Sequence, residues 1–274
     1  MNYLIKDTIR IAIQEDLGHS DVTSCLIIPE AVRVNARIIA KEDFILAGIP
    51  FVREVFFCMG ANADIKIFFE DGRDIKKNDI IADISGNARD ILACERIALN
   101  ILQRISGIAT LTRTYVELVI GLPVRIADTR KTTPGMRYME KYGVRVGGGV
   151  NHRFGLYDGV LIKDNHIKVS GGVRKAVELA KKAHHLMKIE VEVKNAYELN
   201  EALDSGADII MLDNMSLSDM KEAVRIVQGR VVLEASGNVS LENVRKVAET
   251  GVDIISIGAL THSARAVDIS MKIV

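Results

Sequence analysis

The chain has 274 residues, of which 48% are hydrophobic and 26% are charged, and its 36 basic residues balance its 36 acidic ones. This composition is typical of a globular protein and excludes a disordered or fibrous chain. A formal net charge of zero also argues against a protein that nucleic acid or an anionic membrane attracts through its overall field.

The cysteines and the first residues of the chain predict a cytoplasmic protein. Cys25, Cys58 and Cys94 are odd in number and far apart, so neither a disulfide framework nor a structural zinc site is expected. Charged residues from Lys6 onward interrupt the first apolar residues before a signal peptide could form. No stretch reaches the ~18 consecutive apolar residues of a membrane helix. We therefore expect no membrane partner and no nucleic-acid partner.

The first part of the chain mixes helical and strand patterns. Apolar residues recur at every fourth position over residues 5–17, which predicts a helix that ends at Gly18. Residues 32–48 and 63–69 have the pattern of strands, and residues 51–59 that of a helix.

A long helical pattern follows at residues 89–121, and we expect it to break or kink near Gly107. We interpret residues 1–105 as one α+β domain.

Six short apolar runs follow Pro123, and segments of helical character separate most of them. The runs are residues 124–127, 159–162, 189–193, 208–212, 231–235 and 253–257. This alternation predicts βαβ units and a parallel sheet, and its repetition favours a barrel. Because a complete barrel has eight strands, we predict an α/β fold with an incomplete barrel; an open doubly wound sheet is the alternative.

Each of the six predicted strands carries polar residues near its carboxyl end or is followed by polar or glycine residues. They are residues 128–135, residues 163–166, Glu192, Asp213, Ser236 with Gly237, and Gly258 with His262 close behind. Barrel enzymes build their active sites at the carboxyl ends of the strands. Strand ends also abut polar loops in general, but six such ends in chain order favour a functional site.

The segment from Arg125 to Lys168 is rich in cations, with nine basic residues against four acidic ones. In a chain without net charge, this excess indicates either a concave anion site or an exposed basic face. Glycines 147–149 precede Asn151, His152 and Arg153, so backbone N–H groups or the arginine could approach an anion there; a loop that needs positive φ is the alternative. Lys163 could be a cation of the barrel lumen or a strand-end lysine that reaches water.

Two further features indicate how the site is built. Glu190 and Glu192 share one face of a strand, and in a barrel this face points into the lumen, where carboxylates need cations, hydroxyl groups or a metal; a solvated edge strand is the alternative. The loops at Ser236–Gly237 and at Gly258 have the position of a phosphate-binding site, although Ser240 could also simply cap a helix.

At these residues the sequence resembles the quinolinate phosphoribosyltransferases, the carboxylating nicotinate-nucleotide pyrophosphorylases of NAD biosynthesis. The most specific motifs are DTRKTTPG at 128–135, GGGVNHR at 147–153 and LIKDNH at 161–166, and the likeness extends over almost the whole chain. Asn238 stands where many members have a second glycine; asparagine tolerates the left-handed conformation, so the phosphate loop is not in question.

The resemblance implies an α/β sandwich domain over residues 1–105, rejoined by residues 264–274, and an incomplete barrel of six to seven strands over residues 106–263. It also implies a homodimer with shared active sites, in which Arg96 reaches the site of the neighbouring subunit. Assembly beyond the dimer is left open.

The implied reaction transfers a phosphoribosyl group from phosphoribosyl pyrophosphate (PRPP) to quinolinate, with loss of pyrophosphate and carbon dioxide. By the resemblance, quinolinate is bound by Arg96, Arg130, His152, Arg153 and Lys163. PRPP is bound by Lys131, Glu192, Asp213, Ser236, Gly237, Gly258 and His262. The catalytic residues are Lys131, Lys163, Glu192 and Asp213. Mg²⁺ is the implied cofactor, held mainly through PRPP and water near Glu192 and Asp213.

Two other functions remain open on the sequence alone. One is a phosphate-handling lyase or aldolase that uses Lys163 as a Schiff-base nucleophile. The other is a related barrel protein that binds a small oxyanion without turnover.

Overall fold

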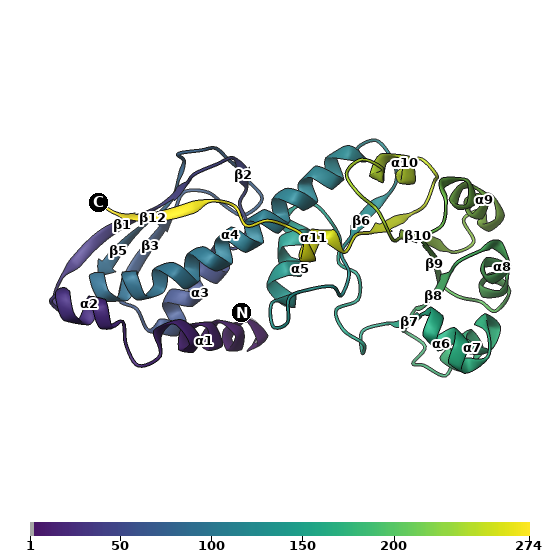
Figure 1. Ribbon diagram of the computed structural model, residues 1–274, viewed down its shortest axis with the longest axis horizontal. Helices are drawn as coiled ribbons and strands as arrows, with labels where there is room; N and C mark the ends of the chain where they lie inside the picture. The colour runs from purple at the N-terminus through teal and green to yellow at the C-terminus, as the bar shows by residue number, and fades with distance from the viewer. Residues whose placement is uncertain (1–2) are drawn as a thin grey trace. The chain divides into compact units, whose positions relative to one another are not determined.

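A computed structural model describes residues 3–274 of the chain (Figure 1). The described chain forms two compact units. The first unit comprises the chain up to Arg113 together with Thr132–Gly148 and Leu260–Val274, and the second comprises Thr114–Lys131 and Gly149–Ala259.

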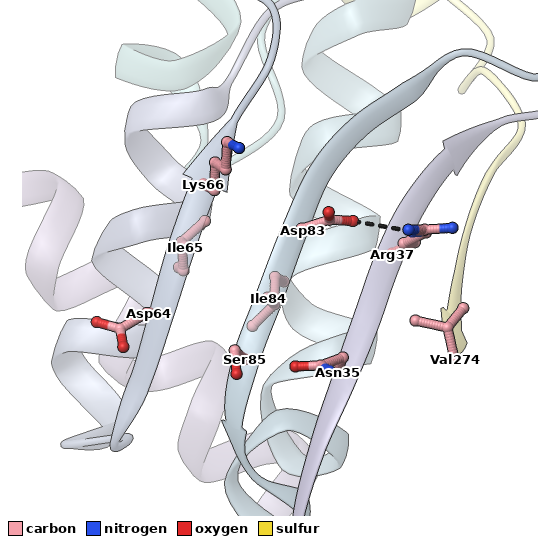
Figure 2. A pocket seen from close by; sticks show the side chains of 9 residues that line it. All are labelled: Asn35, Arg37, Asp64, Ile65, Lys66, Asp83, Ile84, Ser85 and Val274. Carbon is pink, nitrogen blue, oxygen red and sulfur yellow. Dashed lines mark hydrogen bonds and ion pairs between the residues drawn. The ribbon is translucent and has the colours of Figure 1, made fainter.

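The first unit contains a four-stranded antiparallel sheet in the order β12-β1-β5-β3. Its strands are β1 (Arg33–Ala40), β3 (Ala63–Ile67), β5 (Ile80–Asn87) and β12 (Ile269–Ile273). The last strand of the chain thus pairs with the first, with Ile38 opposite Met271. One face of the sheet is covered by helices, and the other carries polar side chains, among them Arg37 and Asp83, whose Nε and Oδ1 lie 3.1 Å apart (Figure 2).

The remaining elements of the first unit are mostly helices. They are α1 (Tyr3–Leu17), α2 (Val22–Ile27), α3 (Ile49–Met59), α4 (Ala88–Leu118), α5 (Arg137–Val146) and α11 (Ala259–His262), with the short strands β2 (Phe44–Ile45) and β4 (Asp74–Ile75). The predicted helices at residues 5–17 and 51–59 are confirmed, as are the strands within 32–48 and 63–69. α4 and α11 extend across the division between the two units.

The expected break of the long helix near Gly107 is wrong, because α4 continues through this residue. Gly107 serves close packing instead: a Cβ atom there would overlap the carbonyl oxygen of Arg265. Gly147 has the same role, since a Cβ atom would lie 2.5 Å from the carbonyl oxygen of Ala109 on α4. These two glycines let distant segments approach the backbone of α4.

The second unit is built on a six-stranded parallel sheet in the order β6-β11-β10-β9-β8-β7. Its strands are β6 (Arg125–Ala127), β7 (Val160–Ile162), β8 (Ile189–Val193), β9 (Ile209–Asp213), β10 (Val232–Ser236) and β11 (Ile254–Ser256). All six predicted strands are therefore confirmed.

The strand order decides between a barrel and a doubly wound sheet. From β7 to β11 the order follows the chain, and β11 then pairs with β6, the first strand. This cyclic order, with the sheet ends at β6 and β7, is that of an incomplete barrel, because a doubly wound sheet reverses its order. Val150 adds a single parallel bridge to Ala127 beyond β6. In Figure 1 the helices lie on one side of the curved sheet, as barrel helices do.

The helices of the second unit connect consecutive strands. They are α6 (Asp164–Ser170), α7 (Val173–Ala180), α8 (Ala196–Asp204), α9 (Leu217–Val227) and α10 (Val244–Ala248). All five residues of β8 are buried, including both glutamates. The alternative that this strand is an edge strand with a solvated face is therefore wrong. None of the helices in the described part of the chain is both long and apolar enough to span a bilayer.

Candidate active site

The carboxyl end of β6 is joined to the segment that follows the three glycines. Asp128 is fully buried and accepts hydrogen bonds from Asn151 Nδ2 at 2.6 Å and from the His152 backbone N–H at 2.9 Å. The bridge between Ala127 and Val150 adds backbone pairing beside them. Asp128 therefore anchors the segment that carries His152 and Arg153 to the barrel.

His152 is held by hydrogen bonds on both sides of its ring. Its Nδ1 accepts the backbone N–H of Arg153 at 2.8 Å, so the proton of the neutral ring lies on Nε2. Nε2 points to Glu190 Oε2 at 3.0 Å and to Glu234 Oε1 at 3.7 Å. Nε2 thus faces both buried carboxylates and is within hydrogen-bond distance of Glu190 alone.

Glu190 and Glu234 form a buried carboxylate pair beside this ring. Their side chains are 7% and 2% exposed, and the ligand atoms that they and His152 offer lie within 4.8 Å of one another. Burial, together with the charge of Glu190, raises the pKa of Glu234 to about 7. The sequence argument placed Glu190 in the lumen, but it missed Glu234, although a lone glutamate inside the apolar strand VLEAS could have indicated it.

Two arginines make the site strongly cationic. Arg153 Nη1 donates to the carbonyl oxygen of Gly159 at 2.8 Å, while its buried Nε has no hydrogen-bond partner among the described residues. Burial lowers the pKa of Arg153, and the nearby charge of Arg130 lowers it further. The charge of Glu190 acts in the opposite direction and offsets part of this repulsion.

Lys163 and Glu192 form an ion pair across neighbouring strands. Lys163 Nζ lies 3.2 Å from Glu192 Oε2, and the side chains are 47% and 10% exposed. This half-exposed lysine, paired with a carboxylate, does not lie in the apolar pocket that activates a Schiff-base lysine. Lys163 is therefore a charged, half-exposed group at the end of β7.

The ends of β9 and β10 are joined by a small network of polar residues. Asp213 lies opposite Ser236 in the parallel register, and the Asn214 N–H donates to the Ser236 carbonyl at 2.9 Å. Gly237 has a φ of +92°, and a Cβ atom there would overlap the Asn214 side chain. Asn238 has a φ of +52°, as predicted, and its Nδ2 donates to Asn214 Oδ1 at 2.9 Å. The sequence argument missed Asn214, which ties the two strand ends together.

The other predicted site residues lie at strand ends or in the first unit. Gly258 follows β11, and the backbone N–H of Lys131 donates to Thr129 Oγ1 at 3.0 Å in the loop after β6. Arg96 is exposed on α4, and His262 Nδ1 lies 2.7 Å from Ser263 Oγ; both belong to the first unit.

Comparison with known proteins identifies one family over almost the whole chain. Residues 21–106 match the family model of the quinolinate phosphoribosyl transferase N-terminal domain, and residues 108–272 match that of its C-terminal domain. The probable nicotinate-nucleotide pyrophosphorylase (carboxylating) of Bacillus subtilis is 42% identical over 275 residues, which cover 100% of this chain and 95% of that protein. The chloroplastic nicotinate-nucleotide pyrophosphorylase (carboxylating) of Arabidopsis thaliana is 42% identical, with 99% and 83% covered.

Comparison with solved structures identifies the same family. The nicotinate-nucleotide pyrophosphorylase of Francisella tularensis superimposes with a TM-score of 0.94 at 42% identity, covering 99% of this chain and 96% of that one. The enzyme of the same name from Ehrlichia chaffeensis gives a TM-score of 0.95 at 41% identity, with 100% and 99% covered.

Proposed function

The chain belongs to the quinolinate phosphoribosyltransferase family, and from this premise we propose how its residues transfer the phosphoribosyl group of PRPP to quinolinate. The enzyme is a pentosyltransferase of NAD biosynthesis. The pyridine nitrogen attacks the ribose C1 carbon, pyrophosphate leaves, and one ring carboxylate departs as carbon dioxide to give nicotinate mononucleotide.

The pair of Arg130 and Arg153 carries the assignment of quinolinate to this site. A planar dicarboxylate matches two guanidinium groups, each of which can donate two parallel hydrogen bonds. The effect of Arg130 on the pKa of Arg153 supports their proximity. Lys163 adds a third cation, and in the dimer Arg96 of the neighbouring subunit adds a fourth. His152 contributes to this site by fixing the segment before Arg153, since its Nδ1 accepts the Arg153 N–H.

Glu192 and Asp213 suit the ribose of PRPP. As the bond to pyrophosphate breaks, positive charge develops on the ribose C1 carbon, and carboxylates near the ring stabilise that charge. Both residues lie at the carboxyl ends of neighbouring strands, β8 and β9. The ion pair with Lys163 Nζ, at 3.2 Å, holds the Glu192 carboxylate in place for this role.

The phosphate groups of PRPP are assigned to the loops that follow the strands. Ser236, Gly237 and Gly258 offer backbone N–H groups to the 5′-phosphate, and the positive φ of Gly237 lets the backbone approach closely. Lys131 and His262 supply cationic or donor groups to the phosphate or pyrophosphate oxygens.

Mg²⁺ is part of the proposal and would be held mainly by PRPP oxygens and water. Asp213 and Glu192 offer the carboxylate oxygens that Mg²⁺ prefers. Within residues 3–274, the potential metal ligands that gather in a group of three are His152, Glu190 and Glu234, and neither Glu192 nor Asp213 belongs to this group. A Mg²⁺ ion near Glu192 and Asp213 would therefore need substrate and water to complete its ligands. When bound, Mg²⁺ stabilises the leaving pyrophosphate.

The protein supplies positioning and electrostatic stabilisation and needs no covalent nucleophile. Arg130 and Arg153 hold the quinolinate carboxylates so that the ring nitrogen faces the ribose. After transfer the ring nitrogen is cationic and accepts the electrons left at the ring carbon when carbon dioxide departs. We also propose a homodimer with shared sites in the cytoplasm, a location that the three free cysteines support.

The function is tested by pyrophosphate release from PRPP in the presence of Mg²⁺. We expect release with quinolinate and not with nicotinate, together with nicotinate mononucleotide identified by mass. Turnover with nicotinate would mean that the arginine pair does not select a dicarboxylate. Binding of quinolinate without release of pyrophosphate would favour a related barrel protein that binds an oxyanion without turnover.

A further inference from the structure

Helix α4 also carries Arg104, about two turns beyond Arg96. Its Nε and Nη2 both donate to Glu140 Oε1, at 3.2 and 2.8 Å. Nη1 donates to the carbonyl oxygen of Ala264 at 2.6 Å, and Nη2 also donates to that of Thr261. The side chain of Arg104 is 25% exposed and that of Glu140 is 0% exposed, so this is a buried ion pair with extra hydrogen bonds.

Glu140 connects the same pair to a second segment. The backbone N–H of Thr133 donates to Glu140 Oε2 at 3.1 Å, and the Thr133 hydroxyl donates to Glu140 Oε1 at 2.9 Å. Thr133 itself is exposed and follows Lys131 by two residues. Through Glu140, the arginine on α4 is thus linked to the loop that carries Lys131.

We propose that Arg104 and Glu140 are positioning residues that fix the two phosphate-binding segments, residues 131–133 and 261–264. The inference rests on the proposed function, which assigns Lys131 and His262 to the phosphate groups of PRPP. Arg104 holds the carbonyl groups of Thr261 and Ala264, which stand on either side of the exposed His262. Glu140 holds Thr133. A single buried ion pair therefore fixes the backbone at both segments.

The bonds of Arg104 distinguish this role from substrate binding. All three guanidinium nitrogens donate to protein oxygens, and Glu140 neutralises the charge. An additional contact of α4 restrains the same region, because Gly107 packs against the carbonyl of Arg265. Exposed segments fluctuate unless their backbone is anchored, and a displacement of about 1 Å at a binding group can cost about 100-fold in rate.

The experiment compares steady-state kinetics of the full-length Arg104→Met and Glu140→Gln variants. We expect KM for PRPP to rise at least about tenfold in each, while KM for quinolinate stays within about threefold of wild type. The double variant is expected to be no worse than the single Arg104→Met variant, because both substitutions break the same connection. Amide hydrogen exchange should become faster at residues 129–135 and 259–264.

Arg89→Met is the matched control. Arg89 also lies on α4 and also holds carbonyl oxygens, with Nε donating to Ile28 at 2.8 Å and Nη2 to Ile28 at 2.6 Å and Cys25 at 3.2 Å. We expect this variant to lose stability without changing either KM. Thermal melts of all variants identify any that fail to fold, and Arg104→Lys then serves as a milder variant, because it keeps the charge but cannot make the fork.

The outcomes separate this inference from the proposed function. The positioning role would be overturned if folded variants had an unchanged KM for PRPP. Equal rises in the KM values for PRPP and quinolinate would also overturn it, because general destabilisation has that effect. If the wild type does not turn over quinolinate, the proposed function fails on its own. In that case amide hydrogen exchange still tests the positioning role. If both segments exchange as slowly in the variants as in the wild type, Arg104 and Glu140 do not fix them.

Discussion

At the scale of single residues, the site contains side chains whose polar atoms are already engaged by the chain itself. His152 has the type of side chain that binds carboxylates, yet both of its ring nitrogens are engaged by the chain itself, one by the Arg153 N–H and the other beside Glu190. Its proposed effect on quinolinate therefore passes through the neighbouring arginine. A residue type at the right sequence position does not reveal which partner occupies its hydrogen bonds.

The buried carboxyl of Glu234 gives a prediction for stability against pH. Its pKa is about 7 in the folded chain against an ordinary value of 4.5, so the native state binds more protons than the unfolded state between these values. The contribution is fully present below pH 4.5 and is lost as pH rises through 7. Glu234→Gln stays uncharged, so it should gain stability relative to wild type across this window, by up to about 3 kcal/mol.

Urea unfolding at pH 5 and pH 8 measures this difference. Glu222→Gln is the control, because Glu222 is exposed on α9 and its pKa is lowered by its bond to Arg225, which places its titration below the window. Parallel stability profiles of Glu234→Gln and wild type would show that Glu234 is ionised throughout.

At the scale of elements, the sequence predicted the features that depend on a local pattern of apolar and polar residues. The six barrel strands were found because each is a short buried apolar run between helical segments. The packing role of Gly107 was missed. The low helix propensity of glycine is visible in the local sequence, but the residue against which Gly107 packs, Arg265, lies far away in the sequence. Glu140 and Glu234 escaped for the same reason: their partners come from other elements.

The substitution Gly107→Ala tests whether helix propensity or close packing against Arg265 determines the residue at this position of α4. Helix propensity alone predicts that alanine stabilises the helix by about 1 kcal/mol. Overlap of the new Cβ with the Arg265 carbonyl predicts destabilisation instead, by about 1–3 kcal/mol. Urea unfolding gives the sign, and Glu117→Ala at an exposed position of the same helix reports the effect of propensity alone. A more stable Gly107→Ala variant would contradict the packing.

At the scale of the whole molecule, the first unit has two roles in the proposed enzyme, and both are located on α4. Arg96 is exposed and, in the proposed dimer, would reach the site of the neighbouring subunit. Arg104 holds segments of its own chain through the carbonyl oxygens of Thr261 and Ala264. In the proposed dimer, these two arginines of one helix would serve different subunits. This division predicts that the subunits can complement one another.

Mixing two inactive variants tests the shared site directly. Arg96→Ala and Arg130→Ala should each lose most activity as pure proteins, since each lacks one cation for quinolinate. After unfolding and refolding together in equal amounts, half of the dimers combine both chains, and each of these has one site with an intact Arg130 and a partner's intact Arg96. About a quarter of wild-type activity should then return. Mixing without exchange of subunits is the control and should restore nothing. If refolded mixtures also stay inactive while mixed dimers form, Arg96 acts within its own subunit and the shared site is wrong.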